Sequence, residues 1–115
     1  LQSQEDNVIY FSQLIQTLAS RVFCYSPKKI SVFYETHSPV TAFNKGSHLY
    51  FNFRCFLETN SGSYRENLIR WFPVFCHEVT HNKHGPHDEI FAYLLGMIFS
   101  HFLPSFMDLL QWLNS

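Results

Sequence analysis

The sequence has little charge of either sign and no concentration of basic residues. Eight Lys and Arg residues stand against nine Asp and Glu residues, so the formal net charge is -1. Nucleic acids and anionic membranes are bound through clustered Lys and Arg, and here the basic residues are scattered along the chain. We therefore expect neither a nucleic-acid partner nor a membrane partner.

Cysteine is scarce as well. The three cysteines, Cys24, Cys55 and Cys76, are odd in number and lack CxxC spacing. This usage argues against a disulfide framework, and because disulfides persist in oxidising compartments, it favours a reducing one. We expect a cytoplasmic or nuclear, intracellular protein.

A long uninterrupted apolar run is also missing. The longest one, around Ile90–Leu103, is interrupted by Ser100 and His101 and is short for a bilayer span. The chain begins at Leu1 rather than at methionine, so we expect a piece excised from a longer polypeptide with other domains. A length of 115 residues, 46% of them hydrophobic, suits one domain over residues 1–115.

Hydrophobic spacing predicts an amino-terminal helix and then a small sheet. Over Val8–Val22 apolar residues recur at intervals of three and four, which is typical of a helix with one buried face. Ile30–Thr36 is rich in β-branched and aromatic residues and predicts a strand. Residues 41–46 predict an edge strand and a turn, and the alternation over His48–Phe56 predicts the second strand of a hairpin.

Helical spacing returns at Tyr64 and continues to His81. Pro73 falls within this stretch, and a proline is tolerated in the first turn of a helix but removes a hydrogen bond further in. Either a new helix begins near Trp71, or one longer helix bends at the proline. Both alternatives place His77 and His81 on a helix.

The last third of the chain predicts two further helices. Gly85 and Pro86 end the preceding helix, since glycine readily adopts the left-handed conformation and proline cannot continue a helix. A helix over Glu89–His101 is closed by Pro104, and a last helix ends at Leu113. The predicted fold class is α+β: a small domain with a short antiparallel sheet, an amino-terminal helix over it, and a motif-bearing helix beneath its edge strand.

The segment with the most chemical content is His77-Glu-Val-Thr-His81, an HExxH motif. Histidines four apart lie on one helix face, so both imidazoles can reach one metal ion. Glu78 projects about a quarter-turn around the helix, where it can accept a proton from metal-bound water. Catalytic zinc usually has three protein ligands and an open fourth position. We predict Zn²⁺ as the cofactor and His87 as the third ligand, with Glu89 as the alternative.

These residues carry a family resemblance. HExxH followed by Asn-x-x-Gly-Pro-His-Asp and an aromatic-containing helix resembles the SprT-like and WLM-type metallopeptidases, over roughly Trp71–Leu95. The resemblance implies a small zincin fold, zinc bound by two motif histidines and one shortly after them, and peptide hydrolysis. There is a second resemblance. Together with the motif, Leu49–Phe56 resembles the carboxy-terminal domain of large NO VEIN-like or sacsin-like proteins with ATPase modules.

The sequence departs from the metzincin pattern HExxHxxGxxH. His84 stands where that pattern has glycine, and Gly85 comes one position later, although His87 keeps the expected offset. Met97 and Met107 both fall in predicted helices, so no clear Met-turn is found. We therefore do not place the chain among the metzincins proper.

The segment Thr41–Phe51 resembles the edge strand of gluzincins. In such zincins this strand pairs with an extended peptide by β-augmentation. We therefore predict that a protein or peptide substrate binds along Phe43, Gly46, Leu49 and Phe51.

The sequence favours a zinc-dependent metallopeptidase with Glu78 as the general base. Two alternatives stay open: a zinc-binding folding or protein-interaction module of a large multidomain protein with little turnover, and an interaction domain without metal. A purely structural zinc site has no need of a carboxylate beside its first ligand and is usually closed by four protein ligands. His84 or Glu89 in the fourth position would favour the structural module.

Overall fold

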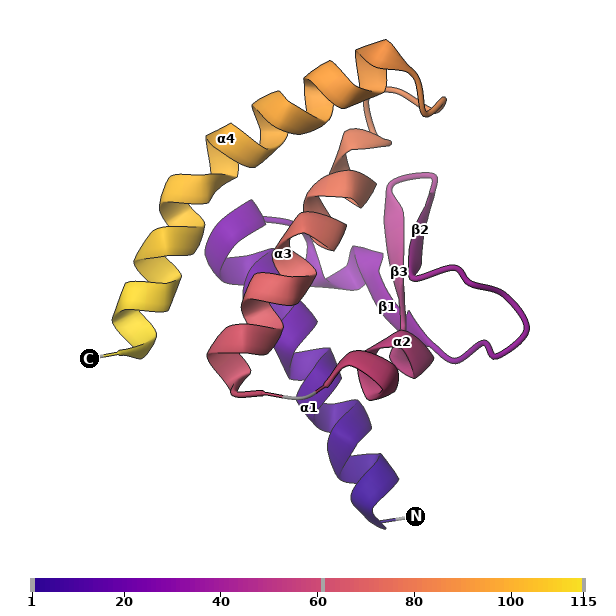
Figure 1. Cartoon of the computed structure of the whole chain (residues 1–115), viewed down its shortest axis with the longest axis vertical. Coiled ribbons are helices and arrows are strands. Elements are labelled where there is room, and N and C mark those ends of the chain that lie inside the picture. Colours follow the sequence, from indigo (N-terminus) through magenta and orange to yellow (C-terminus); the bar gives the residue numbers. More distant parts are fainter. Residues whose placement is uncertain (1, 61, 115) are drawn as a thin grey trace.

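The computed structural model describes residues 2–60 and 62–114. It contains a long amino-terminal helix, then one small sheet, then three further helices (Figure 1). The predicted α+β class is confirmed. The elements are α1 (Gln2–Leu18), β1 (Ile30–Phe33), β2 (Ala42–Lys45), β3 (His48–Asn52), α2 (Phe53–Thr59), α3 (Tyr64–Thr80) and α4 (Glu89–Leu113). A π-helical turn (Ala19–Phe23) extends α1, and a 3₁₀ turn (Pro27–Lys29) leads into β1.

The sheet is mixed, whereas the sequence predicted an antiparallel one. Its strand order is β1-β3-β2; β3 pairs in parallel with β1 and antiparallel with β2. The chain reverses once between β1 and β2 and again between β2 and β3, so β3 returns in the direction of β1 and takes the central position. Alternating hydrophobicity carries no information on relative strand direction. The β2 strand is left as an edge.

The predicted hairpin is confirmed. Gly46 and Ser47 form its two-residue turn, with φ of 59° and 69°, which is the backbone of the primed turns that match the twist of paired strands. Glycine takes this conformation without strain. At Ser47 the conformation is supported by a hydrogen bond from its backbone N–H to Asn44 Oδ1 at 3.0 Å.

The predicted strand over His48–Phe56 is wrong in its last four residues, because α2 begins at Phe53. Asn52 causes the change: its Oδ1 accepts a hydrogen bond from Arg54 N at 3.1 Å and caps the new helix. The apolar side chains of Phe53 and Phe56 are both buried, at a three-residue interval that suits a helix as well as the core.

Asn52 also holds the loop between β1 and β2. Its side chain is fully buried; Nδ2 donates to the carbonyls of Glu35 (3.1 Å) and Val40 (2.8 Å), and Oδ1 accepts from Glu35 N at 3.2 Å. One amide therefore pairs several backbone groups that would otherwise lack partners.

Pro73 and Pro104 each lie inside a continuous helix. Of the two alternatives at Pro73, one longer helix is found, and the predicted break at Pro104 is wrong, because α4 runs unbroken to Leu113. A proline in a helix interior costs about 3 kcal/mol. Packing beyond Pro104 offsets this cost, since Phe106 and Leu109 are buried and Phe106 stacks on Phe72 with ring centroids 4.1 Å apart.

The core is built around α3, which lies between α4 and the sheet in Figure 1. Trp71 meets Phe11 of α1 with ring centroids at 4.8 Å, and Phe75 stacks on Phe23 at 4.2 Å and on Phe51 of β3 at 5.3 Å. Aromatic pairs of this kind add to the free energy gained by burying their area. They fix the position of α3 and so of the histidines at its carboxy-terminal end.

The α4 helix is longer and more apolar than the sequence analysis expected. It has 25 residues, and its most apolar 18-residue window has a mean hydropathy of 1.6 with 17% of it buried. By length and composition alone this helix is long and apolar enough to cross a membrane. That the chain has no membrane partner stays a prediction. The core helix of a soluble protein can meet the same two conditions.

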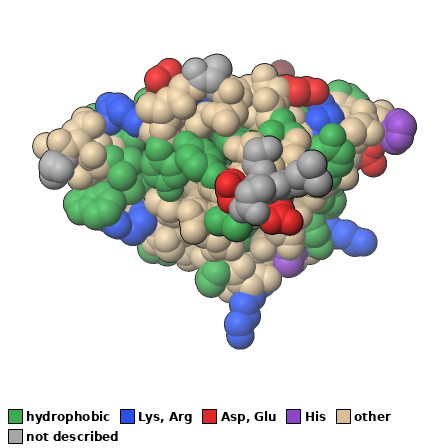
Figure 2. All heavy atoms as spheres, turned by 90° about the horizontal axis from the view of Figure 1, so that it is seen from below, with side chains coloured by type: hydrophobic (Ala, Val, Ile, Leu, Met, Phe, Trp, Pro, Cys, Tyr) green, Lys and Arg blue, Asp and Glu red, His purple; other side chains and the backbone are tan. Residues whose placement is uncertain are grey.

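Charged side chains are spread out on the face seen from below in Figure 2. Hydrophobic side chains gather in a band on this face, and acidic and basic side chains lie separately around it.

We expect Asn52→Ala to lower the free energy of unfolding by about 2–4 kcal/mol, because buried backbone groups lose their partners. Denaturant unfolding measures this change. Asn114→Ala, at an exposed helix end, is the control and is expected to change stability by less than about 0.5 kcal/mol. Equal stability of the two variants would contradict the assigned role of Asn52.

Candidate metal centre

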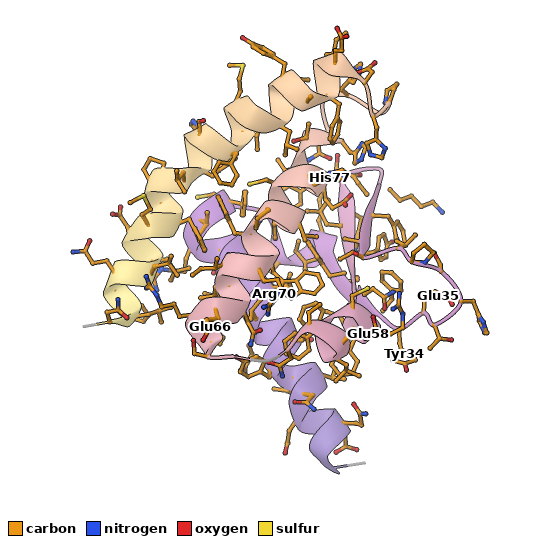
Figure 3. All side chains as sticks on the ribbon, viewed as in Figure 1. Tyr34, Glu35, Glu58, Glu66, Arg70 and His77 are labelled. Carbon is orange, nitrogen blue, oxygen red and sulfur yellow. The ribbon has the colours of Figure 1, made fainter. Side chains whose placement is uncertain are left out.

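Three histidine rings converge where α3 leads into α4. His77 lies in the last turn of α3, His81 is the residue after it, and His87 lies in the following loop. Nε2 of His87 is 3.2 Å from Nε2 of His77 and 2.9 Å from Nε2 of His81. The three rings offer one group of ligand atoms that lie within 4.8 Å of one another and can hold a metal ion. Figure 3 shows His77 at the end of α3 nearest the hairpin.

The separations suit a small divalent ion. Ligand nitrogens at 2.0–2.1 Å from a tetrahedral zinc ion would lie about 3.3 Å apart, and both measured Nε2 distances are within a few tenths of an ångström of this value. Nδ1 of His81 lies 3.2 Å from the carbonyl oxygen of His84. Because a carbonyl only accepts, this nitrogen carries the proton, and the lone pair of Nε2 faces the other two rings.

The turn that brings His87 back differs from the expected one. Gly85 does not take the left-handed conformation, since Gly46 is the glycine with positive φ among the described residues. Instead α3 ends in tighter turns, with Asn82 N bonded to Val79 O at 3.0 Å and Lys83 N to Thr80 O at 2.9 Å. Such i→i+3 bonds pair the last carbonyls of a helix and turn the chain.

Glu78 lies beside the histidines with only 5% of its surface exposed. Burial raises the pKa of its carboxyl from the ordinary 4.5 to about 7. Burial lowers the pKa of His77, and the neighbouring rings of His81 and His87 lower it further. Neutral imidazole is the form that binds metal, so these surroundings favour a metal ligand at His77 and a carboxyl that can both take and release a proton near neutral pH.

Phe91 forms the apolar base of the cluster. It is 5% exposed, and its ring centroid lies 4.8 Å from that of His77, 4.7 Å from that of His81 and 5.0 Å from that of His87. An apolar side chain in contact with all three rings limits their rotation and offers no ligand atom of its own.

Neither alternative ligand belongs to the cluster. Glu89 is exposed in the first turn of α4 and is not among the grouped ligands, which are His77, His81 and His87. Nε2 of His84 lies 2.8 Å and 3.0 Å from the two carboxylate oxygens of Asp88. Among the described residues, the group of ligand atoms therefore consists of the three histidines alone.

Cys76, which adjoins His77, is not a nucleophile of this site. Its side chain is fully buried, and burial raises the pKa of its thiol to about 12. The thiolate is the reactive form of cysteine, so covalent catalysis by Cys76 is disfavoured at neutral pH.

A groove separates the edge strand β2 from the carboxy-terminal half of α3. A cavity of about 480 Å³ is lined by Phe43, Gly46, Glu78 and the rings of His81 and His87, among others. A second cavity, of about 430 Å³, is lined by residues of both elements, including Ala42, His77 and Glu78. Ala42 and Glu78 line both cavities, so the two cavities adjoin at these residues.

The structure divides the four residues predicted to bind substrate into two pairs. Phe43, 38% exposed, and Gly46 line the groove. Leu49 and Phe51 are fully buried on the central strand β3, so their side chains belong to the core, and their prediction as substrate contacts is corrected. The alternation over residues 48–56 identified their shared face, and that face points inward.

Asn44 ties β2 to α3, a role that the sequence analysis missed. Its Nδ2 donates to the backbone carbonyl of Glu78 at 2.8 Å and to Asn82 Oδ1 at 2.7 Å. Asn82 Nδ2 donates to the Tyr25 hydroxyl at 2.9 Å, and that hydroxyl donates to Ser47 O at 2.5 Å. With the bond between Asn44 and Ser47 N, these contacts close a ring that sets the spacing of edge strand and helix. An asparagine in a short strand gave no sequence signal of this contact across 34 positions.

We expect the wild-type protein to bind a divalent transition metal and His81→Ala to lose this binding. A metal that binds only the folded state adds about 2.7 kcal/mol of stability at 100 times its dissociation constant. Thermal unfolding with and without Zn²⁺ or Co²⁺ measures the gain. His101→Ala, at an exposed position on α4, is the control and should keep it; a full gain in His81→Ala would refute the site.

The raised pKa of Glu78 predicts a pH dependence of stability in the metal-free protein. A carboxyl whose pKa is higher in the folded than in the unfolded state holds its proton more tightly when folded, so its ionisation reduces stability as pH rises from about 4.5 to about 7. We expect the free energy of unfolding of Glu78→Gln, relative to that of wild type, to rise by about 3 kcal/mol as pH increases across this interval. Above this interval the difference should stay constant. Denaturant unfolding of both proteins with a chelator present, from pH 4 to 8, tests this; parallel profiles would contradict it.

No family model matches the chain, and comparisons with curated proteins and with solved structures also find no match. The function is therefore inferred from the site itself.

Proposed function

We propose that this domain is a zinc-dependent metallopeptidase, with Zn²⁺ held by His77, His81 and His87. The observation that carries the proposal is the convergence of three Nε2 atoms beside a buried carboxylate, at the edge of a groove. Zinc with three imidazole ligands and an open position lowers the pKa of a bound water and polarises a carbonyl. Three imidazoles also suit other transition metals. Zinc is proposed because three protein ligands, with a fourth position left for water, are the usual set at catalytic zinc.

Glu78 is the proposed general base. It takes the proton of the attacking water on its carboxylate and then delivers that proton to the amine that leaves as the peptide bond breaks. A group that exchanges a proton in both directions works best when its pKa lies near the working pH, and burial moves Glu78 toward that range. A cation bound beside it would favour its ionised form.

The proposed substrate is an extended peptide laid along β2. This strand is the edge of the sheet, and the two adjoining cavities run beside it to Glu78. A peptide added as a further strand gains main-chain hydrogen bonds whatever its sequence, and side-chain pockets then give preference. The ring of bonds from Asn44 to α3 keeps this strand at a set distance from the carboxylate.

The resemblance to SprT-like and WLM-type metallopeptidases supports the same proposal, since it comes from the segment that supplies all three histidines. In the alternative proposal, the domain binds zinc as a folding or interaction module of a longer chain with little turnover. A test that keeps the metal and removes the base separates the two.

We expect Glu78→Gln to retain zinc and to lose at least about 100-fold in kcat/KM, which is the usual contribution of a general base. Release of fluorescence from a quenched peptide library and digestion of denatured casein measure turnover, and metal content is measured on the same samples. Glu89→Gln, the neighbouring exposed acid, is the matched control and should remain active. Equal turnover by wild type and Glu78→Gln would remove the peptidase proposal and leave the zinc-binding module.

A further inference from the structure

The loop between α3 and α4 contains a second pair of polar side chains that the proposed chemistry does not use. His84 and Asp88 bond to each other and each contacts a part of the metal centre. We propose that this pair, here called the Asp88–His84 brace, orients the metal-binding histidines before a metal arrives. Both are therefore positioning residues. Its effect on metal affinity rests on the proposed metal centre, its effect on the His81 ring does not, and neither requires peptidase activity.

Asp88 makes contacts in two directions. Its Oδ1 accepts a hydrogen bond from Phe91 N at 3.0 Å and caps the first turn of α4. The same carboxylate faces His84 Nε2 at 2.8 Å and 3.0 Å. The carboxylate thus links the start of one helix to the loop that follows the other. Because His87 directly precedes Asp88, the cap also restrains the backbone that carries the third ligand.

His84 passes this restraint to His81. The backbone carbonyl of His84 lies 3.2 Å from His81 Nδ1 and accepts its proton. This bond selects the tautomer whose Nε2 is free to bind metal and sets the plane of the ring. The imidazole of His84, anchored by Asp88 at the other side of the loop, holds that carbonyl in place.

The cap also places the apolar base of the cluster. Phe91, whose N–H bonds to Asp88, has its ring in contact with His77, His81 and His87. A shift of the first turn of α4 would therefore move the surface on which all three rings rest. One carboxylate thereby restrains His87 through its backbone, His81 through a carbonyl and the whole cluster through Phe91.

The partial exposure of His84 and Asp88 indicates that their main role is to orient the metal-binding histidines rather than to stabilise the fold. The side chains of His84 and Asp88 are 22% and 46% exposed, and ion pairs at such positions contribute little to folding. Groups that hold the ligands of a metal, in contrast, typically change its affinity 10- to 100-fold when they are removed.

The experiment compares zinc affinities, by competition with a chromophoric chelator, in variants that separate the two contacts of Asp88. Asp88→Ser keeps a side-chain oxygen for the helix cap and removes the partner of His84. His84→Ala keeps the carbonyl and the cap and removes the imidazole. We expect both to lose about tenfold or more in Zn²⁺ affinity. Glu89→Gln, which removes the neighbouring negative charge without touching the brace, should bind as wild type does.

A second measurement needs no metal. Long-range ¹⁵N spectra of the imidazoles should show His81 of the metal-free wild type mainly as the Nδ1-protonated tautomer, and both brace variants as a mixture. This measurement does not depend on zinc binding. Failure of the wild type to bind zinc would refute the metal centre and the proposed function, and the brace would then be judged on the His81 tautomer alone. Circular dichroism confirms that each variant compared is folded.

Two results would overturn the inference. Wild-type zinc affinity together with an unchanged His81 tautomer in both variants would show that the pair orients nothing. Asp88→Ala, a further variant that removes both contacts, tests the helix cap: a loss of affinity in Asp88→Ala with no loss in Asp88→Ser or His84→Ala would show that the cap alone is responsible.

Discussion

The structure depends on one electrostatic constraint: Nε2 of His87 is held about 3 Å from Nε2 of both His77 and His81, beside the end of one helix. Lone pairs directed at a common point repel unless a proton or a cation lies between them. Burial and then the two other rings lower the pKa of His77, so an additional proton is disfavoured there. A metal ion at this point would remove the repulsion, and its positive charge would also suit the buried carboxylate of Glu78. The remaining features of the domain can be understood as what holds this arrangement together.

Rigid packing supplies the necessary restraint on α3. Phe75 stacks between Phe23 and Phe51, and Phe72 stacks on Phe106 beyond the proline of α4. These contacts anchor α3 against the sheet on one side and against α4 on the other. Close-packed interiors transmit small displacements rather than absorbing them. The packing of α3 therefore also fixes the positions of the histidines at its end. The ring of hydrogen bonds through Asn44 extends the same restraint to the groove.

Much of the site could be predicted from the sequence because its ligands are close in sequence. Helical spacing and the turn after α3 sufficed to bring His87 toward the motif, although the turn does not use Gly85 as expected. The contact of Asn44 with α3 escaped prediction because it joins residues 34 positions apart and depends on how sheet and helix dock. Hydrophobic spacing gave wrong predictions where other contacts determine the structure. Asn52 caps a helix where a strand was predicted, and core packing stabilises α4 beyond Pro104.

The shortness of the loop between α3 and α4 has a consequence for how the domain assembles. The three ligands span ten positions, from His77 to His87, so closing the loop between them costs little chain entropy. Contacts of such low sequence separation form early, whereas the pairing of β1 with β3 and the docking of α1 must wait for distant segments to meet. In a full-length chain that refolds, the three histidines could therefore come together before the sheet has formed. A metal bound at this corner would then hold together one unit onto which the rest of the domain folds.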